Sequence, residues 1–156
     1  MSQRVGAIRK MFRHAESSRK KLLRAAKSID KESFLSRRKG LSSIRDLQVH
    51  LMDTEDYWVG SVIMGERRRK FSPEKYEDAA SLEQDWNSIR QRTRDFLSAL
   101  SEQVLSDKRT VEWDRKLTFE VDEVLWQLLT HELHHNGQIC LLMRETGHQA
   151  PELDIL

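Results

Sequence analysis

Three of the six histidines lie within five residues, in the stretch His131-Glu132-Leu133-His134-His135. Side chains four residues apart lie on one face of a helix, with their Cβ atoms about 5–6 Å apart. His131 and His135 can therefore offer two imidazoles to one metal ion, at Zn–N distances of about 2.0–2.1 Å. Both fall on an apolar stripe with Val124 and Leu128, so we expect them to face inward and to be neutral, the form that binds metal.

His50 is the candidate for a third ligand. It lies on the flank of a second helical stripe that contains Leu47 and Trp58, so we expect it to point inward or nearly so. Three histidines from two helices leave a coordination position open, as in catalytic rather than structural metal sites. Asp46, one turn before His50, is expected to accept a hydrogen bond from that imidazole.

The same five residues also satisfy H-E-x-x-H, the metalloprotease signature in which Glu132 would be the general base. The extended form of that signature is not met, because no histidine follows at the required spacing, although Glu145 or Glu152 could add a carboxylate ligand. Histidines that merely pack in a core are the remaining alternative. We expect His134 to be exposed and Cys140 to pack rather than act as a nucleophile.

Apolar side chains at steps of three and four predict four helices. They run from about 5 to 29, from Ser42 or Ser43 to about Gly65, from 79 to 100 and from 121 to 144. The segment 110–119 is predicted to be a short hairpin or an extended crossover. The pattern predicts an all-α chain, a four-helix bundle that forms a single domain over residues 1–156.

The composition limits the possible classes of protein. One cysteine among 156 residues excludes a disulfide scaffold and favours a reducing, cytoplasmic location. The first residues carry no long apolar stretch, so we expect no secretory signal, and no run approaches the ~18 apolar residues of a membrane helix.

Charge is unevenly distributed along the chain. Residues 1–50 hold 14 Lys and Arg against 4 Asp and Glu, a net charge of +10, whereas the remainder carries −8. This basic third could attract nucleic acid, but no aromatic side chains that would stack on bases are interleaved with it. A solvated helix face is the favoured interpretation, and no nucleic-acid partner is expected.

The carboxy-terminal residues resemble a known family. The stretches 134–139 (His-His-Asn-Gly-Gln-Ile) and 141–147 (Leu-Leu-Met-Arg-Glu-Thr-Gly), followed by Pro151 and Asp154, are similar to the signature of the DinB/YfiT-like superfamily. Its usual form is a histidine, three residues, then His-Arg-Gly-Gln, so Asn136 replaces a common arginine. The segment 47–58 is similar to that family's other histidine-bearing stretch.

The resemblance implies an up-up-down-down four-helix bundle, often a homodimer, that holds zinc or nickel on His50, His131 and His135. Some members are transferases or isomerases that use low-molecular-weight thiols such as bacillithiol, which implies a metal-dependent thiol S-transferase acting on small electrophiles. Arg19, the one charge that interrupts the first apolar stripe, is the candidate for binding a carboxylate of such a thiol; extension of its side chain to solvent is the alternative.

Two other functions remain open on these residues. A metal-bound water could act as hydroxide in a metal-dependent hydrolase. A non-enzymatic metal-binding stress-response protein would use the ion only to stabilise the bundle. If the chain is a homodimer, then Trp113, Phe71 and Phe34, all in predicted connections, are candidates for exposed contacts.

Overall fold

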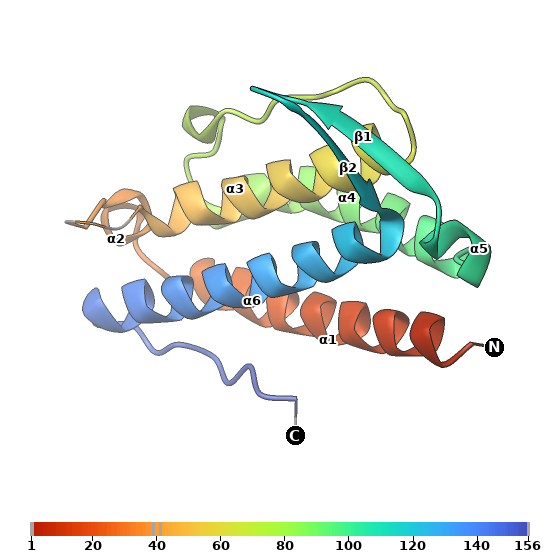
Figure 1. Cartoon of the computed structure of the whole chain (residues 1–156). Helices are drawn as coiled ribbons and strands as arrows, with labels where there is room; N and C mark the ends of the chain where they lie inside the picture. Colours follow the sequence, from red (N-terminus) through yellow and green to blue (C-terminus); the bar gives the residue numbers. More distant parts are fainter. Residues whose placement is uncertain (1, 39, 41, 156) are drawn as a thin grey trace.

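The computed structural model describes residues 2–38, 40 and 42–155, most of which are helical (Figure 1). The elements in chain order are α1 (Gln3–Ala26), α2 (Lys31–Leu35), α3 (Ile44–Glu55), a π-helical segment (Asp56–Ile63), a 3₁₀ turn (Pro73–Lys75), α4 (Ala79–Ser98), α5 (Glu102–Leu105), β1 (Lys108–Glu112), β2 (Lys116–Glu120) and α6 (Val121–Glu145).

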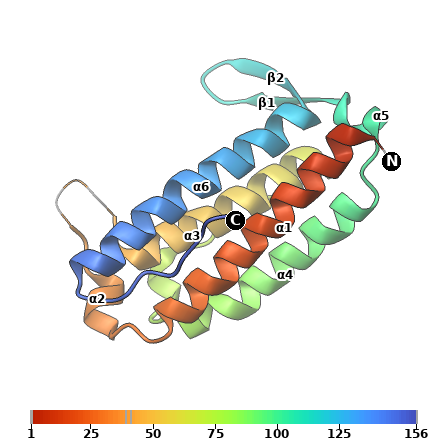
Figure 2. The ribbon, with the colours of Figure 1, turned by 90° about the horizontal axis from the view of Figure 1, so that it is seen from below.

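The long helices α1, α3, α4 and α6 form a four-helix bundle, which confirms the predicted fold. α1 and α3 each pack against both α4 and α6, so that α1 lies diagonally across the bundle from α3 (Figure 2). Helix starts are fixed by side-chain caps, as at Ser43, whose hydroxyl accepts from the backbone N–H of Asp46. Within the part of the chain that the structure describes, no helix is both long and apolar enough to cross a membrane.

The directions of the helices differ from the expected up-up-down-down order. Arg4 at the start of α1 is paired with Asp122 at the start of α6, so these helices are parallel. Arg9 donates to the carbonyl of Leu97 at the end of α4, so α4 is antiparallel to α1. α3 runs with α4, and the order is up-down-down-up (Figures 1 and 2). Residues 64–78 connect these two helices in the sequence and bring the chain back along the outside of the bundle, so that α4 can start at the same end as α3.

The predicted hairpin is confirmed. β1 and β2 are antiparallel, with Lys108 opposite Glu120 and Glu112 opposite Lys116, and β2 leads directly into α6. The hairpin lies beside the end of the π-helical segment, where Arg109 donates to the carbonyl of Ile63. It therefore covers one end of the face formed by α3 and α6 (Figure 1).

Two apolar clusters fill the bundle, and a buried layer of charges separates them. Each long helix contributes one residue to this layer: Arg19 from α1, Glu55 from α3, Arg90 from α4 and Glu132 from α6, all no more than 6% exposed. Arg19 lies 2.5 Å from Glu55 and 2.6 Å from Glu132, and Arg90 lies 3.1 and 3.3 Å from the same carboxylates. We call these four residues the ionic layer.

Phe34 was expected to be exposed in a connection, but α2 folds over the end of the bundle and buries it. It is 1% exposed and belongs to the apolar cluster near α2. Phe71 is half-buried against the same cluster. Of the three aromatic residues proposed as exposed contacts, only Trp113, which is 53% exposed, lies largely in solvent.

Candidate metal centre

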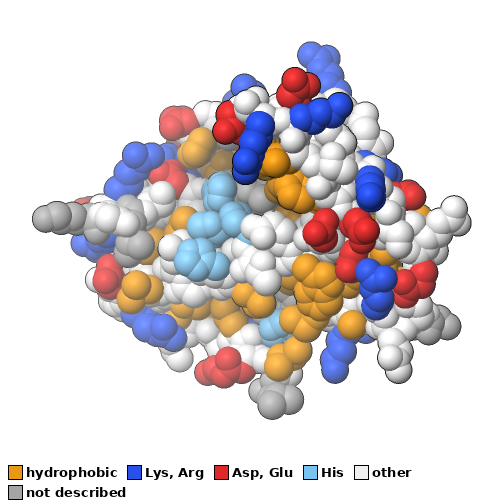
Figure 3. All heavy atoms as spheres, viewed as in Figure 1, with side chains coloured by type: hydrophobic (Ala, Val, Ile, Leu, Met, Phe, Trp, Pro, Cys, Tyr) orange, Lys and Arg blue, Asp and Glu red, His pale blue; other side chains and the backbone are white. Residues whose placement is uncertain are grey.

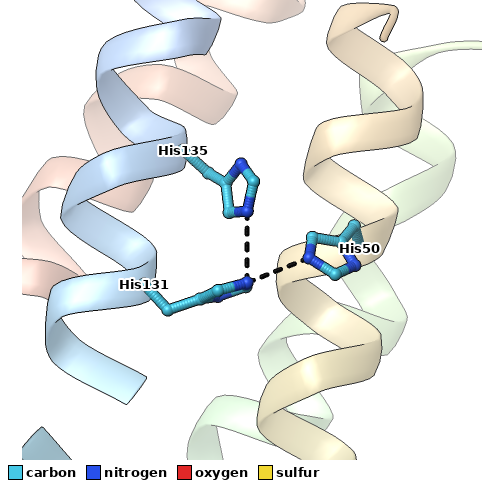
Figure 4. Close-up of side chains that lie close together, drawn as sticks. All are labelled: His50, His131 and His135. Atoms are coloured by element: carbon cyan, nitrogen blue, oxygen red, sulfur yellow. Dashed lines mark hydrogen bonds between the residues drawn. The ribbon is translucent and has the colours of Figure 1, made fainter. Parts of the chain in front are cut away.

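The structure brings His50, His131 and His135 together across the groove between α3 and α6 (Figure 4). His131 and His135 project from consecutive turns of α6, and His50 faces them from α3. The Nε2 atom of His131 lies 3.0 Å from Nε2 of His50 and 3.1 Å from Nε2 of His135. Three imidazole nitrogens therefore converge on one point.

This donor set fits a divalent ion. Two ligands at about 2.0–2.1 Å from a tetrahedral ion lie roughly 3.3 Å from each other, close to the separations seen here. Without an ion, Nε2 of His131 has either one hydrogen or one lone pair, but it faces two neighbouring ring nitrogens. It therefore cannot make a well-aligned hydrogen bond to each of them. An ion at the centre would instead take one lone pair from each ring.

The surroundings of His50 and His131 favour the neutral forms of these two rings. Burial, together with the neighbouring imidazoles of His135 and His50, lowers the pKa of His131 to about 4. Burial also lowers the pKa of His50. Neutral imidazoles have the free lone pair that a metal requires, so the site is ready to bind at neutral pH.

The cluster lies at the surface of the bundle and not in its interior, so the expected inward orientation is wrong. His50 is exposed, and His131 and His135 are half-buried. Figure 3 shows histidine side chains together on this face, next to hydrophobic ones. The residues of α6 that point inward here are Glu132 and Asn136, each one position further along the chain. As a result, one side of the histidine cluster is open to solvent.

Gln138 holds the ring of His135, a contact that the sequence analysis did not identify. The Nδ1 atom of His135 lies 2.6 Å from Oε1 of Gln138. Because an amide oxygen only accepts, Nδ1 carries the hydrogen and the lone pair of Nε2 is left for a metal. The spacing of three residues on one helix was a signal that could have identified this pair.

Asp46 does not orient His50, contrary to expectation. Its carboxylate is paired instead with Arg45 at 2.9 Å and with Arg37 at 2.7 Å. It is buried at the first turn of α3, where a negative charge also favours the helix dipole. The acidic residue that influences the ring of His50 is Asp53, which raises its pKa against the larger effect of burial.

Glu132 and Arg19 both belong to the ionic layer. Two nitrogens of Arg19 donate to the carboxylate of Glu132, which turns Glu132 away from the histidines and is inconsistent with a metalloprotease general base. Arg19 is buried and does not extend to solvent. Its role in binding a carboxylate of a cofactor stays a prediction, and its charge is already paired with Glu55 and Glu132.

A cavity of about 230 Å³ adjoins the histidines, with His50 and His131 in its wall. Tyr57, Trp58 and Trp113 form much of the remaining wall. Trp58, Trp113 and Gln127 also line a neighbouring cavity of about 410 Å³, which extends to Phe119 on the hairpin. The rings of Trp58 and Trp113 meet edge to face at 5.9 Å, and Trp113 Nε1 donates to the hydroxyl of Tyr57. An aromatic-walled space therefore lies directly beside the candidate metal position.

His134 and Cys140 lie where the sequence predicts. His134 is exposed, with its ring 5.0 Å from that of His135. Cys140 is buried, and burial raises the pKa of its thiol. A protonated, buried thiol is a poor nucleophile, so the packing role expected for Cys140 is consistent with its surroundings.

Known proteins resemble the chain over most of its length. An uncharacterized protein of Bacillus subtilis, YizA, is 26% identical over 114 residues, which cover 73% of this chain and 71% of YizA. Among solved structures, a DinB-like protein from Bacillus cereus matches with a TM-score of 0.69 and 18% identity over 89% of both chains. YfiT from Bacillus subtilis matches with a TM-score of 0.72 and 19% identity, over 96% of this chain and 91% of YfiT.

YfiT is described as a probable metal-dependent hydrolase with an unusual four-helix bundle topology. At these identities the solved structures establish that the fold is shared. The model of the DinB family matches residues 1–156, the full length of the sequence. Together with the four-helix bundle, this match shows that the chain belongs to the DinB family.

Proposed function

We propose that this chain binds one divalent ion, zinc or nickel, on His50, His131 and His135, and that it is a metal-dependent enzyme acting on small molecules. The convergence of three imidazoles on the open side of a groove carries the proposal. Three protein ligands leave at least one position for water or substrate. Imidazole ligands suit zinc and nickel equally, so the donor set does not choose between them.

A bound divalent metal would supply Lewis acidity and lower the pKa of a coordinated nucleophile such as water or a thiol. The chain's own residues provide position and shelter. Gln138 fixes the ring of His135, and Trp58 and Trp113 form an apolar wall beside the site. That wall fits a substrate with an aromatic or aliphatic part, while Gln127 offers it a hydrogen bond.

Hydrolysis is the reaction that we place first. YfiT, which shares the fold, is described as a probable metal-dependent hydrolase. Thiol S-transfer to small electrophiles is the second candidate, because family resemblance implies it and the open groove would admit a thiol. It lacks the expected cationic anchor for a cofactor carboxylate, since Arg19 is paired within the ionic layer. A non-enzymatic metal-binding role would leave the aromatic cavity without a purpose.

The proposal is tested first by the metal content of protein purified without a histidine tag. We expect about one equivalent of zinc or nickel in the wild type and in a His134→Ala control, and a large loss in His50→Ala, His131→Ala and His135→Ala. Metal that is bound equally by His134→Ala and His135→Ala would contradict the site.

The second test measures turnover on a panel of aryl esters, lactones and amides, and on thiol–electrophile pairs. Activity that disappears in His135→Ala and on chelation, and returns with added metal, supports an enzyme. Hydrolysis without added thiol favours the first reaction, and strict thiol dependence favours the second. Full metal occupancy with no turnover on either panel would favour the non-enzymatic protein.

Four further features stay predictions. They are a homodimer, a cytoplasmic location, a small-molecule substrate that includes a low-molecular-weight thiol, and a single domain over residues 1–156. Sedimentation velocity at several protein concentrations measures the first of these directly.

A further inference from the structure

A second concave site lies on the side of the bundle away from the histidines. The histidines sit between α3 and α6, whereas this groove lies between α1 and α4, which run side by side in Figure 2. Its volume is about 390 Å³, within the range of small-molecule sites. Four arginines and one carboxylate line it: Arg9, Arg13, Arg90, Arg94 and Glu16.

The charges on the rim of this groove are arranged to favour an anion. Glu16 is occupied by Arg94 at 2.6 Å and by Lys20 at 2.8 Å. Arg9 is held by backbone carbonyls at the end of α4. Arg13 is exposed on α1 and has no acidic partner among the residues described in the structure. A guanidinium fixed at the rim and another free to move would together attract a negatively charged group.

Arg90 gives the independent observation that points to a ligand. It is 4% exposed and lines the groove from α4. Its Nη2 atom contacts Glu55 and Glu132 of the ionic layer, but its buried Nε and Nη1 atoms have no hydrogen-bond partner. Buried N–H groups of a charged side chain are costly to leave unpaired, so the oxygen atoms of an anion that displaces the side chains covering them would satisfy them.

The groove also has an apolar part. Phe12 and Leu97 line it, and the ring of Phe12 lies 5.9 Å from the guanidinium carbon of Arg90. An anion with an aromatic or aliphatic portion could therefore place its charge on the arginines and its apolar part on these side chains. Nucleic acid fits less well, because the site is a concave pocket and not an extended basic surface with several aromatic side chains on which bases could stack.

We propose that the groove between α1 and α4 binds a small organic anion, with a phosphate or carboxylate group held by Arg13, Arg94 and Arg90. The site is separate from the histidine cluster and does not depend on a metal. It gives a function to part of the basic amino-terminal third, which the proposed enzyme does not use.

The test is isothermal titration with phenyl phosphate at low ionic strength. We expect the double variant Arg13→Ala/Arg94→Ala to bind at least about tenfold more weakly, which is the loss of roughly one charge-assisted hydrogen bond. The charge-matched double variant Lys10→Ala/Arg24→Ala changes exposed residues of α1 outside the groove and should bind within about twofold of the wild type. Arg13→Ala alone, at an exposed position, gives a variant whose folding is not at issue.

Further titrations separate the chemistries. Benzoate tests a carboxylate in place of phosphate, inorganic phosphate tests the need for the ring, and benzyl alcohol tests the need for charge. His135→Ala should bind phenyl phosphate like the wild type, which distinguishes this site from the metal centre. In NMR spectra of arginine side chains, the Nε–Hε signal of Arg90 should shift as the ligand saturates.

Three results would overturn the proposal. They are no saturable binding at millimolar phenyl phosphate, equal weakening in the groove and control double variants, and loss of binding in His135→Ala. If the protein binds duplex DNA and both double variants weaken that binding equally, then the arginines attract anions only through their overall positive charge, which would also contradict a specific site.

Discussion

His135 shows how single residues prepare the metal centre. One ring nitrogen faces the other imidazoles, and the other is held by Gln138 at 2.6 Å. A partner of this kind fixes both the hydrogen position and the orientation of the ring before a metal arrives.

Removing that partner should weaken metal binding without abolishing it. We expect Gln138→Ala to lower metal affinity about 10- to 100-fold, measured by competition with a chromogenic chelator. Gln138→Glu keeps an accepting oxygen and should retain most of the affinity. The control is Gln127→Ala, which lines the cavity but makes no hydrogen bond to a histidine ring. Equal affinities for wild type and Gln138→Ala would show that the contact does not position the ligand.

At this scale, residue type and spacing were enough to pair His131 with His135, since i,i+4 spacing is a property of any helix. His50 was added from its place beside an apolar stripe and from the family resemblance. The assignment of Asp46 as the partner of His50 was wrong, because Arg45, its neighbour on α3, and Arg37, from the preceding connection, compete for its carboxylate. Partners supplied from other segments cannot be read from helix spacing.

Among the elements, the end of α3 departs most from expectation. The predicted continuous helix is an α-helix to Glu55 and then a π-helical segment, Asp56–Ile63. π-Helical turns are rare and often occur at functional sites. Here the segment carries Tyr57 and Trp58, which form part of the cavity wall beside His50.

Gly60 lies in this segment beneath the guanidinium of Arg92. A Cβ at position 60 would lie 2.8 Å from that group, which is itself held by Asp56 and Glu66 at 2.7 Å. We therefore expect Gly60→Ala to destabilise the protein by about 1 kcal/mol through loss of those contacts. The measurement is the free energy of unfolding from urea titration.

Gly137 is the matched control, because a Cβ there meets nothing within 4 Å. It lies within α6, so Gly137→Ala should stabilise the protein by about 0.5–1 kcal/mol. In an Arg92→Ala background the cost of Gly60→Ala should disappear. If Gly60→Ala still destabilises the protein in the Arg92→Ala background, then the destabilisation comes from the backbone of the π-helical segment and not from the contacts of Arg92.

Helix positions were predicted well, and so were the inward faces of α1 and α4, but the phase in the middle of α3 and α6 was not. The predicted inward positions Thr54 and Trp58 are half-buried, while Glu55 and Val59 point into the bundle. Apolar periodicity assumes that charged residues face solvent. That assumption fails at Glu55 of α3, and for the same reason Glu132 replaces His131 on the inward face of α6.

For the whole molecule, the ionic layer should determine behaviour in acid. Burial alone would raise the pKa of Glu55, but Arg19, Arg90 and a hydrogen bond from Thr93 outweigh it and lower that pKa from 4.5 to about 2. When the pKa of a carboxyl is lower in the folded than in the unfolded state, that carboxyl stabilises the fold at every pH above its unfolded-state pKa. That stability, up to about 3 kcal/mol, is lost as the pH falls from 4.5 towards 2.

Thr93→Val tests this because it removes the hydroxyl that donates to Glu55 at 2.5 Å. The pKa of Glu55 should rise, so the acid unfolding transition followed by circular dichroism should move to higher pH. Thr130→Val changes an exposed threonine of α6 whose hydroxyl contacts only carbonyls of its own helix, and it should leave the transition in place. A transition unmoved by Thr93→Val would mean that other carboxylates control acid unfolding.

The bundle as a whole was predictable from four amphipathic segments, whereas the helix directions were not. Periodicity is identical for a helix read in either direction, so it cannot distinguish up-up-down-down from up-down-down-up. The information lies in contacts between distant residues, such as Arg4 with Asp122, and in the length of the connection 64–78 that allows α3 and α4 to be parallel.

Two cations and two anions cancel at the middle of the molecule, and each comes from a different helix. Replacing any one of them with a neutral residue leaves a buried charge without its partner, which destabilises the fold by about 3–5 kcal/mol. Evolution can therefore alter positions 19, 55, 90 and 132 only in compensating couples. Across descendants of a common ancestor these four sites should change jointly or stay fixed, while the rims of both grooves drift independently.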